Sequence, residues 1–260
     1  MGEWEYEVSR IIVERYLRKL LNALRCDVLI AGAGPSGLVA AYYLARNDVR
    51  VTILERKLAP GGGVWGGGME RNEVVIQTAA KAILEEMGIS VELETEDFYA
   101  LDSVLLASGL TYNALREGAT MLNLVTVEDV MLESDRLTGL VVNSTGVVLN
   151  KMHVDPITLS AKVVLDGTGH DAMIATMVQD HGGKLATPTG RIMGQGPMQA
   201  QSAEDFVVSH TGKIYPGLYL AGMSVAVVHG GPRMGPIFGG MILSGKKAAE
   251  QVLEELKSKR

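Results

Sequence analysis

The sequence predicts an α/β fold, and three features of its N-terminal part carry this prediction. An apolar stretch at residues 27–31 has the length and composition of a buried strand. It leads into Gly-x-Gly-x-x-Gly at residues 32–37, which opens an apolar helical stretch over residues 36–47. A second apolar stretch, residues 49–55, ends in the acidic Glu55. This order is typical of a dinucleotide-binding βαβ unit, so we expect a Rossmann-like fold.

Each glycine of this unit has an expected role at the ligand. Gly32 would make the tight turn, Gly34 would let a diphosphate approach the backbone, and Gly37 would let the helix pack closely. The diphosphate would lie at the helix N-terminus, where free amides and the helix dipole favour an anion. Glu55 would accept hydrogen bonds from ribose hydroxyls and would repel a 2′-phosphate, which favours NAD or FAD over NADP.

The remaining elements follow from hydrophobic periodicity and from glycine positions. Residues 3–24 carry apolar side chains at helical spacing, which predicts an amphipathic helix that packs on the body or on a neighbouring subunit. No repeat or linker divides the chain, so we expect residues 1–260 to form one domain with a β-rich layer inserted around residues 120–160. We further expect a glycine loop at 60–68, helices at 74–88 and 103–117, strands at 121–127, 137–143, 161–165 and 217–222, a glycine- and methionine-rich layer at 179–206, a glycine-rich loop at 229–240 and a helix at 240–257.

The composition excludes several classes of protein. The net charge of −6 and the pI near 5.4 disfavour nucleic-acid binding. No apolar run reaches the roughly 18 residues of a membrane span, and the acidic N-terminus lacks a signal-peptide pattern, so we expect a cytoplasmic protein without membrane contact. The one cysteine, Cys26, excludes an intramolecular disulfide and is expected to be a small core residue at the start of the first strand.

A late strand bears on the choice of dinucleotide. The pattern around the glycine motif is that of the two-dinucleotide-binding-domain flavoproteins, in which a late strand is followed by Gly-Asp and the aspartate binds the flavin ribityl chain. The corresponding residues here are Gly222 and Met223, and a thioether accepts such hydrogen bonds poorly. We therefore expect this type of fold without tightly bound FAD.

Three polar side chains in the second half of the chain are candidate metal ligands. If residues 149–154 are extended, His153 and Asp155 point to the same face. His170 follows the expected strand at 161–165, at the kind of strand end where α/β folds place ligands. Two imidazoles and a carboxylate would suit Fe(II) with open positions. The alternative is that these are surface or loop-capping residues that never meet.

Arg233 is a candidate for recognising a carboxylate. It lies among the glycines and prolines of the loop at 229–240, which would hold it rigidly and bring few competing charges. It would then clamp a small carboxylate through two hydrogen bonds. The alternative is a solvated surface arginine.

Taken together, these segments resemble the thiazole synthases of thiamine biosynthesis, of the archaeal and eukaryotic type. The resemblance covers most of the chain after residue 25, and the combination of motifs is highly specific. The matching stretches are Ile30–Gly37, Leu58–Gly68, His153–Pro156, Thr168–Asp171, Ala221–Met223 and Arg233–Gly239.

The resemblance implies that NAD is a substrate and not a redox carrier. Nicotinamide leaves, the ADP-ribose opens and isomerises to a ketose, glycine condenses with it, and sulfur addition closes an ADP-linked thiazole carboxylate. Family members are octamers, and an Fe(II) site is completed across a subunit boundary. By resemblance, Asp155 and His170 are the Fe(II) ligands, Arg233 binds the glycine carboxylate, Met223 lies against the ligand, and Ser36, Glu55, Arg56, Gly63 and Val127 hold the adenosine diphosphate.

One position departs from the eukaryotic pattern. Those enzymes carry a cysteine two residues before the Asp-Pro pair and give up its sulfur in a single turnover, whereas this chain has His153 there. Sulfur would then come from outside, most simply as sulfide, and the enzyme would turn over repeatedly. His153 is also a candidate general acid–base. The alternatives are an FAD-dependent oxidoreductase of the same fold, an isomerase that forms ribulose 1,5-bisphosphate, and a non-catalytic NAD-binding protein.

Overall fold

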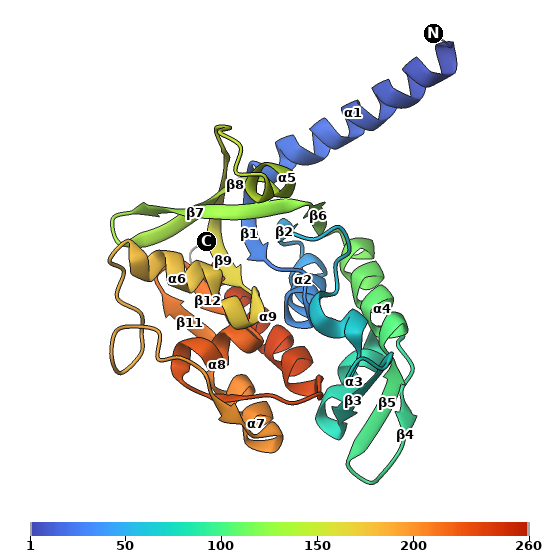
Figure 1. Cartoon of the computed structure of the whole chain (residues 1–260), viewed down its shortest axis with the longest axis vertical. Coiled ribbons are helices and arrows are strands. Elements are labelled where there is room, and N and C mark those ends of the chain that lie inside the picture. The colour runs from blue at the N-terminus through green and yellow to red at the C-terminus, as the bar shows by residue number, and fades with distance from the viewer. Residues whose placement is uncertain (1, 259–260) are drawn as a thin grey trace.

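Parallel strands form the centre of the structure, a computed structural model that describes residues 2–258 (Figure 1). Within this range an eight-stranded sheet contains a parallel part in the order β12, β9, β1, β2, β6. β11 pairs antiparallel with β12 at one edge. The bounds are β1 Arg25–Ala31, β2 Val51–Glu55, β6 Thr120–Asn123, β9 Ile157–Asp166, β11 Gly212–Tyr215 and β12 Leu218–Leu220.

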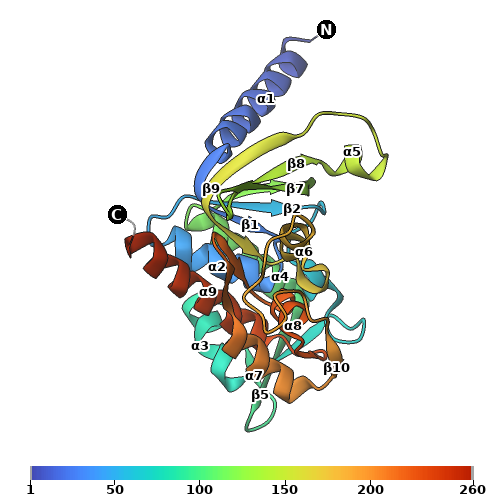
Figure 2. The ribbon, with the colours of Figure 1, turned by 90° about the vertical axis from the view of Figure 1, so that its left-hand side faces the viewer.

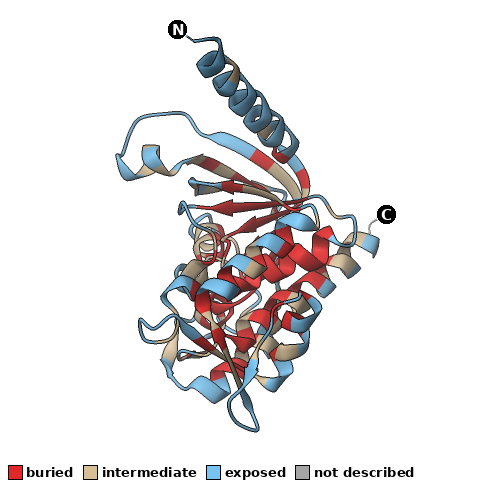
Figure 3. Cartoon of the chain, turned by 90° about the vertical axis from the view of Figure 1, so that its right-hand side faces the viewer, coloured by how far each residue is buried: buried red, intermediate tan, exposed pale blue. Residues whose placement is uncertain are grey.

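Alternating side chains of the central strands fill two separate cores. Val28, Ile30 and Ile53 face one core, which they share with the helices. Leu29 and Leu54 face the other, because successive strand residues point to opposite sides of a sheet. Figure 3 shows buried residues along the central strands and the helices beside them. The helices that pack in the first core include α2 Pro35–Ala45, α3 Thr78–Glu86, α4 Ser103–Arg116 and α9 Gly239–Ser258.

A β-hairpin covers the second face of the parallel strands. β7 (Val125–Glu133) and β8 (Arg136–Ser144) pair antiparallel, and β8 pairs with the first part of β9. The second part of β9 lies between β1 and β12, so this one strand joins the inserted layer to the parallel sheet. The expected strand at 121–127 is divided, because Leu124 has a positive φ of 57° between β6 and β7.

A small sheet corrects the expected helix at 74–88. Its first residues form β3 (Glu73–Gln77), and α3 begins only after them. β3 pairs with β5 (Phe98–Asp102), which also pairs with β4 (Glu92–Leu93). Val74 and Ile76 are buried by this pairing. The β-branched residues Val74–Ile76 alternate in burial and pair with β5, so the helix begins later than the sequence prediction placed it.

The C-terminal half surrounds the ends of β9 and β12 with short elements. β10 and β13 pair parallel with each other beside the main sheet. The glycine- and methionine-rich region at 179–206 includes β10 and the start of α7, and the loop expected at 229–240 contains β13. The bounds are α6 Met173–Asp180, β10 Gly196–Met198, α7 Ala200–His210, α8 Met223–His229 and β13 Pro232–Arg233, with short 3₁₀ turns at Gly62–Gly66 and Gly169–Asp171.

Two segments project from this body (Figure 2). One is helix α1 (Glu3–Ala23), as expected from its periodicity, and among its residues only Ala23 is buried. The other is the connection from β8 to β9, which contains the short helix α5 (Thr145–Leu149). Residues 149–154 do not form the strand on which a common face of His153 and Asp155 was conditional, because α5 ends at Leu149 and β9 begins only at Ile157. No helix in residues 2–258 is both long and apolar enough to cross a membrane.

Candidate functional site

A cavity of about 640 Å³ lies at the carboxyl ends of β1 and β9. β2 pairs with one side of β1 and β9 with the other, so the strand order reverses direction at β1. In open α/β sheets the crevice beside such a reversal is the usual ligand site. The amide of Gly167 donates to the carbonyl of Ala31 over 2.9 Å, which joins the two strand ends at the floor of the cavity.

The glycine motif shapes the cavity floor. Gly32 has a φ of +97°, and a Cβ there would lie 2.5 Å from the Gly167 carbonyl oxygen. A Cβ on Gly34 would meet nothing within 4 Å, so this glycine leaves open space at the N-terminus of α2. Gly37 does not line the cavity; a Cβ there would lie 2.2 Å from the Gly32 oxygen, which makes its role close packing.

Glu55 is a buried carboxylate at the end of β2 that lines the cavity. Its Oε2 accepts from the amide of Ala33 over 3.0 Å, and its Oε1 accepts from the amide of Lys57 over 2.8 Å. These bonds hold the side chain rigidly against the glycine loop. A carboxylate has about four acceptor positions, so two remain for hydroxyl donors of a ligand.

Charged groups of both signs line the rest of the cavity. Arg56 forms an ion pair of 3.0 Å with Asp171, which connects the end of β2 to the turn after β9. Lys57 and Arg233 add two further cations, and Arg233 reaches the cavity from β13. This excess of cations suits a ligand that carries phosphate or carboxylate groups.

The turn that carries His170 is built on the buried Asp166. One carboxylate oxygen accepts from the amide and hydroxyl of Thr168, over 3.0 and 2.7 Å. The other accepts from the amides of Ile174 and Ala175, each over 3.0 Å, and so caps the start of α6. Burial raises the pKa of Asp166, and these four hydrogen bonds oppose the rise.

The structure gathers ten of the residues singled out from sequence around one cavity. His153 and Asp155 are not among them; both are exposed on the projecting connection between α5 and β9. In residues 2–258 of one chain, no three histidine, cysteine, aspartate or glutamate side chains come together as a metal site. The ten residues at the cavity are Gly32, Gly34, Ser36, Glu55, Arg56, Gly63, Val127, His170, Met223 and Arg233.

Sequence reasoning missed several residues of the same cavity. Lys57 lies two positions after Glu55, and its side chain has no motif that marks it. Asp171 lines the cavity after the Gly-Thr-Gly turn. Asp166 supports this turn from below the cavity surface, and an acid directly after a buried apolar strand was a readable signal for a turn-capping carboxylate. Apolar lining comes from Met173, Met198, Met234 and Phe238.

The fold and the cavity define an α/β protein with an FAD/NAD-binding Rossmann-like fold. A geranylgeranyl bacteriochlorophyll reductase-like protein from Thermoplasma acidophilum has the same fold, with a TM-score of 0.62 and 15% identity over 90% of this chain and 79% of that one. The similarity is far greater to the crystal structure of Thermovibrio ammonificans THI4, with a TM-score of 0.95 and 42% identity over 97% of this chain and 98% of that one.

Sequence comparison gives the family. The sequence model of the Thi4 family matches residues 9–238. Thiamine thiazole synthases from Thermotoga maritima and Thermococcus kodakarensis are 50% and 48% identical, over 96% and 97% of this chain and 97% and 98% of their own lengths. The chain belongs to the Thi4 family, and thus to the thiamine thiazole synthases, which are enzymes of thiamine biosynthesis.

Proposed function

We propose that the chain converts NAD, glycine and sulfide to an ADP-linked 5-ethyl-4-methylthiazole-2-carboxylate, with release of nicotinamide and with Fe(II). The observation that carries this proposal is the single cavity in which the glycine motif, Glu55, His170 and Arg233 meet. It combines a nucleotide-binding floor with a carboxylate-binding cation and an imidazole. Each group is one that this combination of substrates needs.

The adenosine end of NAD would lie along the glycine motif. The open space at Gly34 admits a diphosphate to the N-terminus of α2, and the fixed carboxylate of Glu55 would accept from the ribose hydroxyls. Ser36, Arg56, Gly63 and Val127 line the same part of the cavity. Met223 is buried at the start of α8 and would close the apolar side of the ligand.

Arg233 would hold the carboxylate of glycine. Arg233 lines the same cavity as His170, is exposed, and forms no ion pair with an acidic side chain in the described part of the chain. The N–H donors of its guanidinium are therefore available to a substrate. Two parallel hydrogen bonds from them would orient glycine toward the opened ribose.

The donor set fits Fe(II) when two subunits contribute. Imidazole and carboxylate are suitable iron ligands, and His170 offers its ring at the cavity mouth. Asp155 is exposed on a projecting segment, where it is free to reach the cavity of a neighbouring subunit. Bound there, Fe(II) would supply an open position for soft sulfide beside the substrate.

The sulfur would come from outside the chain. Cys26 is 3% exposed, donates to the carbonyl of Val28 over 3.3 Å, and does not line the cavity. Burial raises its pKa to about 11, which leaves the thiol protonated and unreactive at neutral pH. With His153 in place of a donor cysteine, repeated turnover on sulfide is the consistent reaction.

The assembly would be a homo-octamer that covers the exposed apolar surface. Trp4, Ile12 and Val13 of α1 are 83%, 61% and 63% exposed in the single chain. Leu149 and Met152 beside the His153 segment are also exposed. Apolar patches of this kind on two projecting segments are typical of subunit interfaces.

The test is anaerobic incubation with NAD, glycine, sulfide and Fe(II), followed by mass spectrometry of the small molecules. We expect many equivalents of adenylated thiazole carboxylate per chain, and no thiazole when iron or sulfide is left out. Intact NAD after long incubation would contradict the proposal. Release of nicotinamide without thiazole would contradict its sulfur source.

A further inference from the structure

Gln195 contacts the imidazole ring of His170. Its Oε1 lies 3.0 Å from Nδ1 of the His170 ring, and Gln195 itself does not line the cavity. We propose that Gln195 is a positioning residue, which fixes the tautomer and the ring orientation of His170 so that Nε2 is the metal-binding nitrogen. This inference rests on the proposed role of His170 as an iron ligand.

The chemistry of a neutral imidazole links the two ring nitrogens. One nitrogen carries the proton and donates, and the other accepts or binds a metal. An amide oxygen only accepts, so Oε1 facing Nδ1 requires the proton to be on Nδ1. Nε2 then keeps its lone pair. Metal-binding histidines in general donate their second N–H to such an acceptor.

The backbone holds Gln195 firmly in place. The amide of Gly194 donates to the carbonyl of Val227 over 3.0 Å, and the amide of Gly196 donates to that of Gly231 over 2.8 Å. The side chain is thereby presented to the His170 turn from a segment tied to the end of α8. The contact with His170 is the one side-chain hydrogen bond of Gln195 among residues 2–258, and its buried Nε2 has no partner there.

The same segment also positions the carboxylate-binding arginine. β10 begins directly after Gln195, and its Met198 is paired in register with Arg233 of β13. The short pairing of β10 with β13 therefore positions Arg233 and, through Gln195, also His170. The proposed metal ligand and the proposed glycine clamp are held in a fixed relation without contacting each other directly.

Two substitutions distinguish the loss of the hydrogen-bond acceptor from a change in side-chain shape. Gln195→Met keeps the unbranched shape and removes the acceptor, whereas Gln195→Glu keeps an acceptor oxygen. Gln201→Met is the matched control, since Gln201 is exposed on α7. The first readout is the tautomer of His170 in metal-free protein, from ¹⁵N NMR of histidine-labelled chain, with the His170 signal among the five histidines assigned by a His170→Asn difference spectrum.

The second readout is Co(II) affinity from its visible absorption. We expect the Nδ1–H tautomer in the unmodified protein and in Gln195→Glu. For Gln195→Met we expect a mixture of tautomers and about 10- to 100-fold weaker Co(II) binding, which is the usual cost of losing such a partner. Gln201→Met should match the unmodified protein in both readouts.

The outcomes distinguish a failure of the inference about Gln195 from a failure of the proposed function on which it rests. An Nε2–H tautomer in the unmodified protein, or equal Co(II) affinity in Gln195→Met, would overturn the role of Gln195. Co(II) affinity that His170→Asn leaves unchanged would instead overturn His170 as a ligand, whatever the Gln195 variants do.

Discussion

Two buried carboxylates beside the cavity differ in how fully they are hydrogen-bonded. Asp166 accepts from four donors, and its surroundings therefore fit an acceptor. Glu204 on α7 accepts from Gln77 and from the amide of Gly240 through one oxygen, and its Oε1 is buried with no hydrogen-bond partner in the described chain. Burial raises the pKa of Glu204, and the neighbouring Asp205 raises it further. Glu204 is therefore a residue at which the folded state opposes a charge with few hydrogen bonds to compensate.

We expect Glu204→Gln to stabilise the protein at neutral pH. A carboxyl whose pKa is raised by folding destabilises the folded state above its unfolded pKa, and this cost disappears as the pH falls through the raised value. The variant should gain about 1 kcal/mol at pH 8. Thermal melts from pH 8 down to about pH 4.3, the ordinary glutamate pKa, should show the gap closing. A gap that is constant over this range would contradict the assignment.

In the proposed reaction, the sulfur source depends on the side chain at position 153. We expect His153→Cys to make about one equivalent of thiazole per chain without added sulfide, because the thiol would occupy the position of a donor cysteine. Mass spectrometry of the protein should then show the loss of one sulfur atom. Ala at the same position is the control, and it should make no product without sulfide. An unchanged need for sulfide in His153→Cys would count against the positional argument.

At the scale of elements, local patterns predicted the βαβ unit well. Strands β1 and β2 and helix α2 have uninterrupted apolar runs with glycine punctuation, so their signal lies within a few residues. β3 has a shorter signal, the β-branched run Val74–Ile76, which the prediction of one helix over 74–88 passed over. Its pairing with β5 makes this run a strand.

The candidate site likewise contains residues that could be placed from sequence and residues that could not. The glycine motif and Glu55 are adjacent to strands and could be placed from sequence. The sequence leaves open whether His153 and Asp155 meet His170, because no sequence signal could show that the α5–β9 connection leads away from the cavity of its own chain. Gln195 and Lys57 depend on where loops return, which the three-dimensional structure alone reveals.

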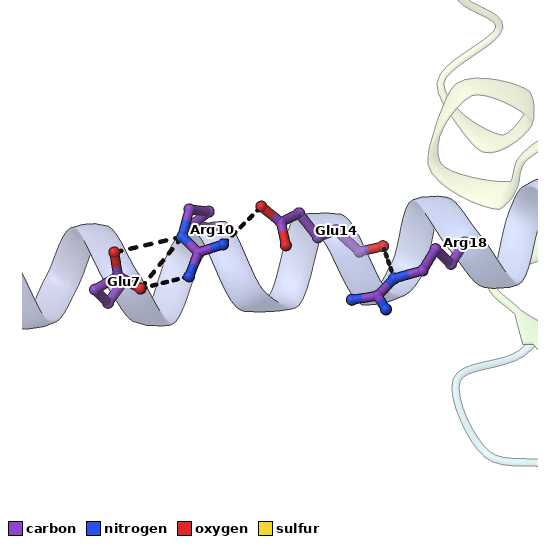
Figure 4. Close-up of polar contacts among 4 residues, drawn as sticks. All are labelled: Glu7, Arg10, Glu14 and Arg18. Carbon is purple, nitrogen blue, oxygen red and sulfur yellow. Dashed lines mark hydrogen bonds and ion pairs between the residues drawn. The ribbon is translucent and has the colours of Figure 1, made fainter.

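Helix α1 has a polar stripe and a largely apolar remaining surface. Glu7, Arg10, Glu14 and Arg18 form one polar stripe, in which Arg10 pairs with Glu7 and Glu14 over 2.7 and 2.8 Å (Figure 4). Exposed apolar side chains cover much of the remaining circumference. A helix of 21 residues is about 31 Å long, which provides a long apolar surface for a partner.

We expect Ile12→Glu to weaken the assembly, because a carboxylate would be buried on the apolar surface opposite the polar stripe. Sedimentation velocity should show smaller species at micromolar concentration. Arg10→Ala is the control: it removes only exposed ion pairs, which solvent screens, and should leave the sedimentation coefficient unchanged. Intact assembly in Ile12→Glu would show that α1 is not at an interface.

At the scale of the whole molecule, one chain holds only part of the proposed iron site. His170 lies at the cavity, and Asp155 lies on a projection of the same chain that does not reach it. A symmetric assembly lets each projection serve the cavity of a neighbour. Activity would then be a property of pairs of subunits.

This arrangement predicts complementation between two inactive variants. Asp155→Ala and His170→Ala should each abolish thiazole formation when expressed alone. When the two are co-expressed and purified as mixed oligomers by two different tags, about a quarter of the sites should combine an intact residue from each chain. Product formation by the mixed oligomers is the readout. Mixed oligomers without any activity would place both ligands within one chain.

The burial of Cys26 has a practical consequence for following such assemblies. The chain has one cysteine, and that thiol lies within the sheet with a pKa near 11. A maleimide or methanethiosulfonate reagent would therefore react selectively with a cysteine introduced on the surface. Nitroxide labels placed on the polar stripe of α1 would report distances between subunits by pulsed electron paramagnetic resonance, with no need to remove a native residue first.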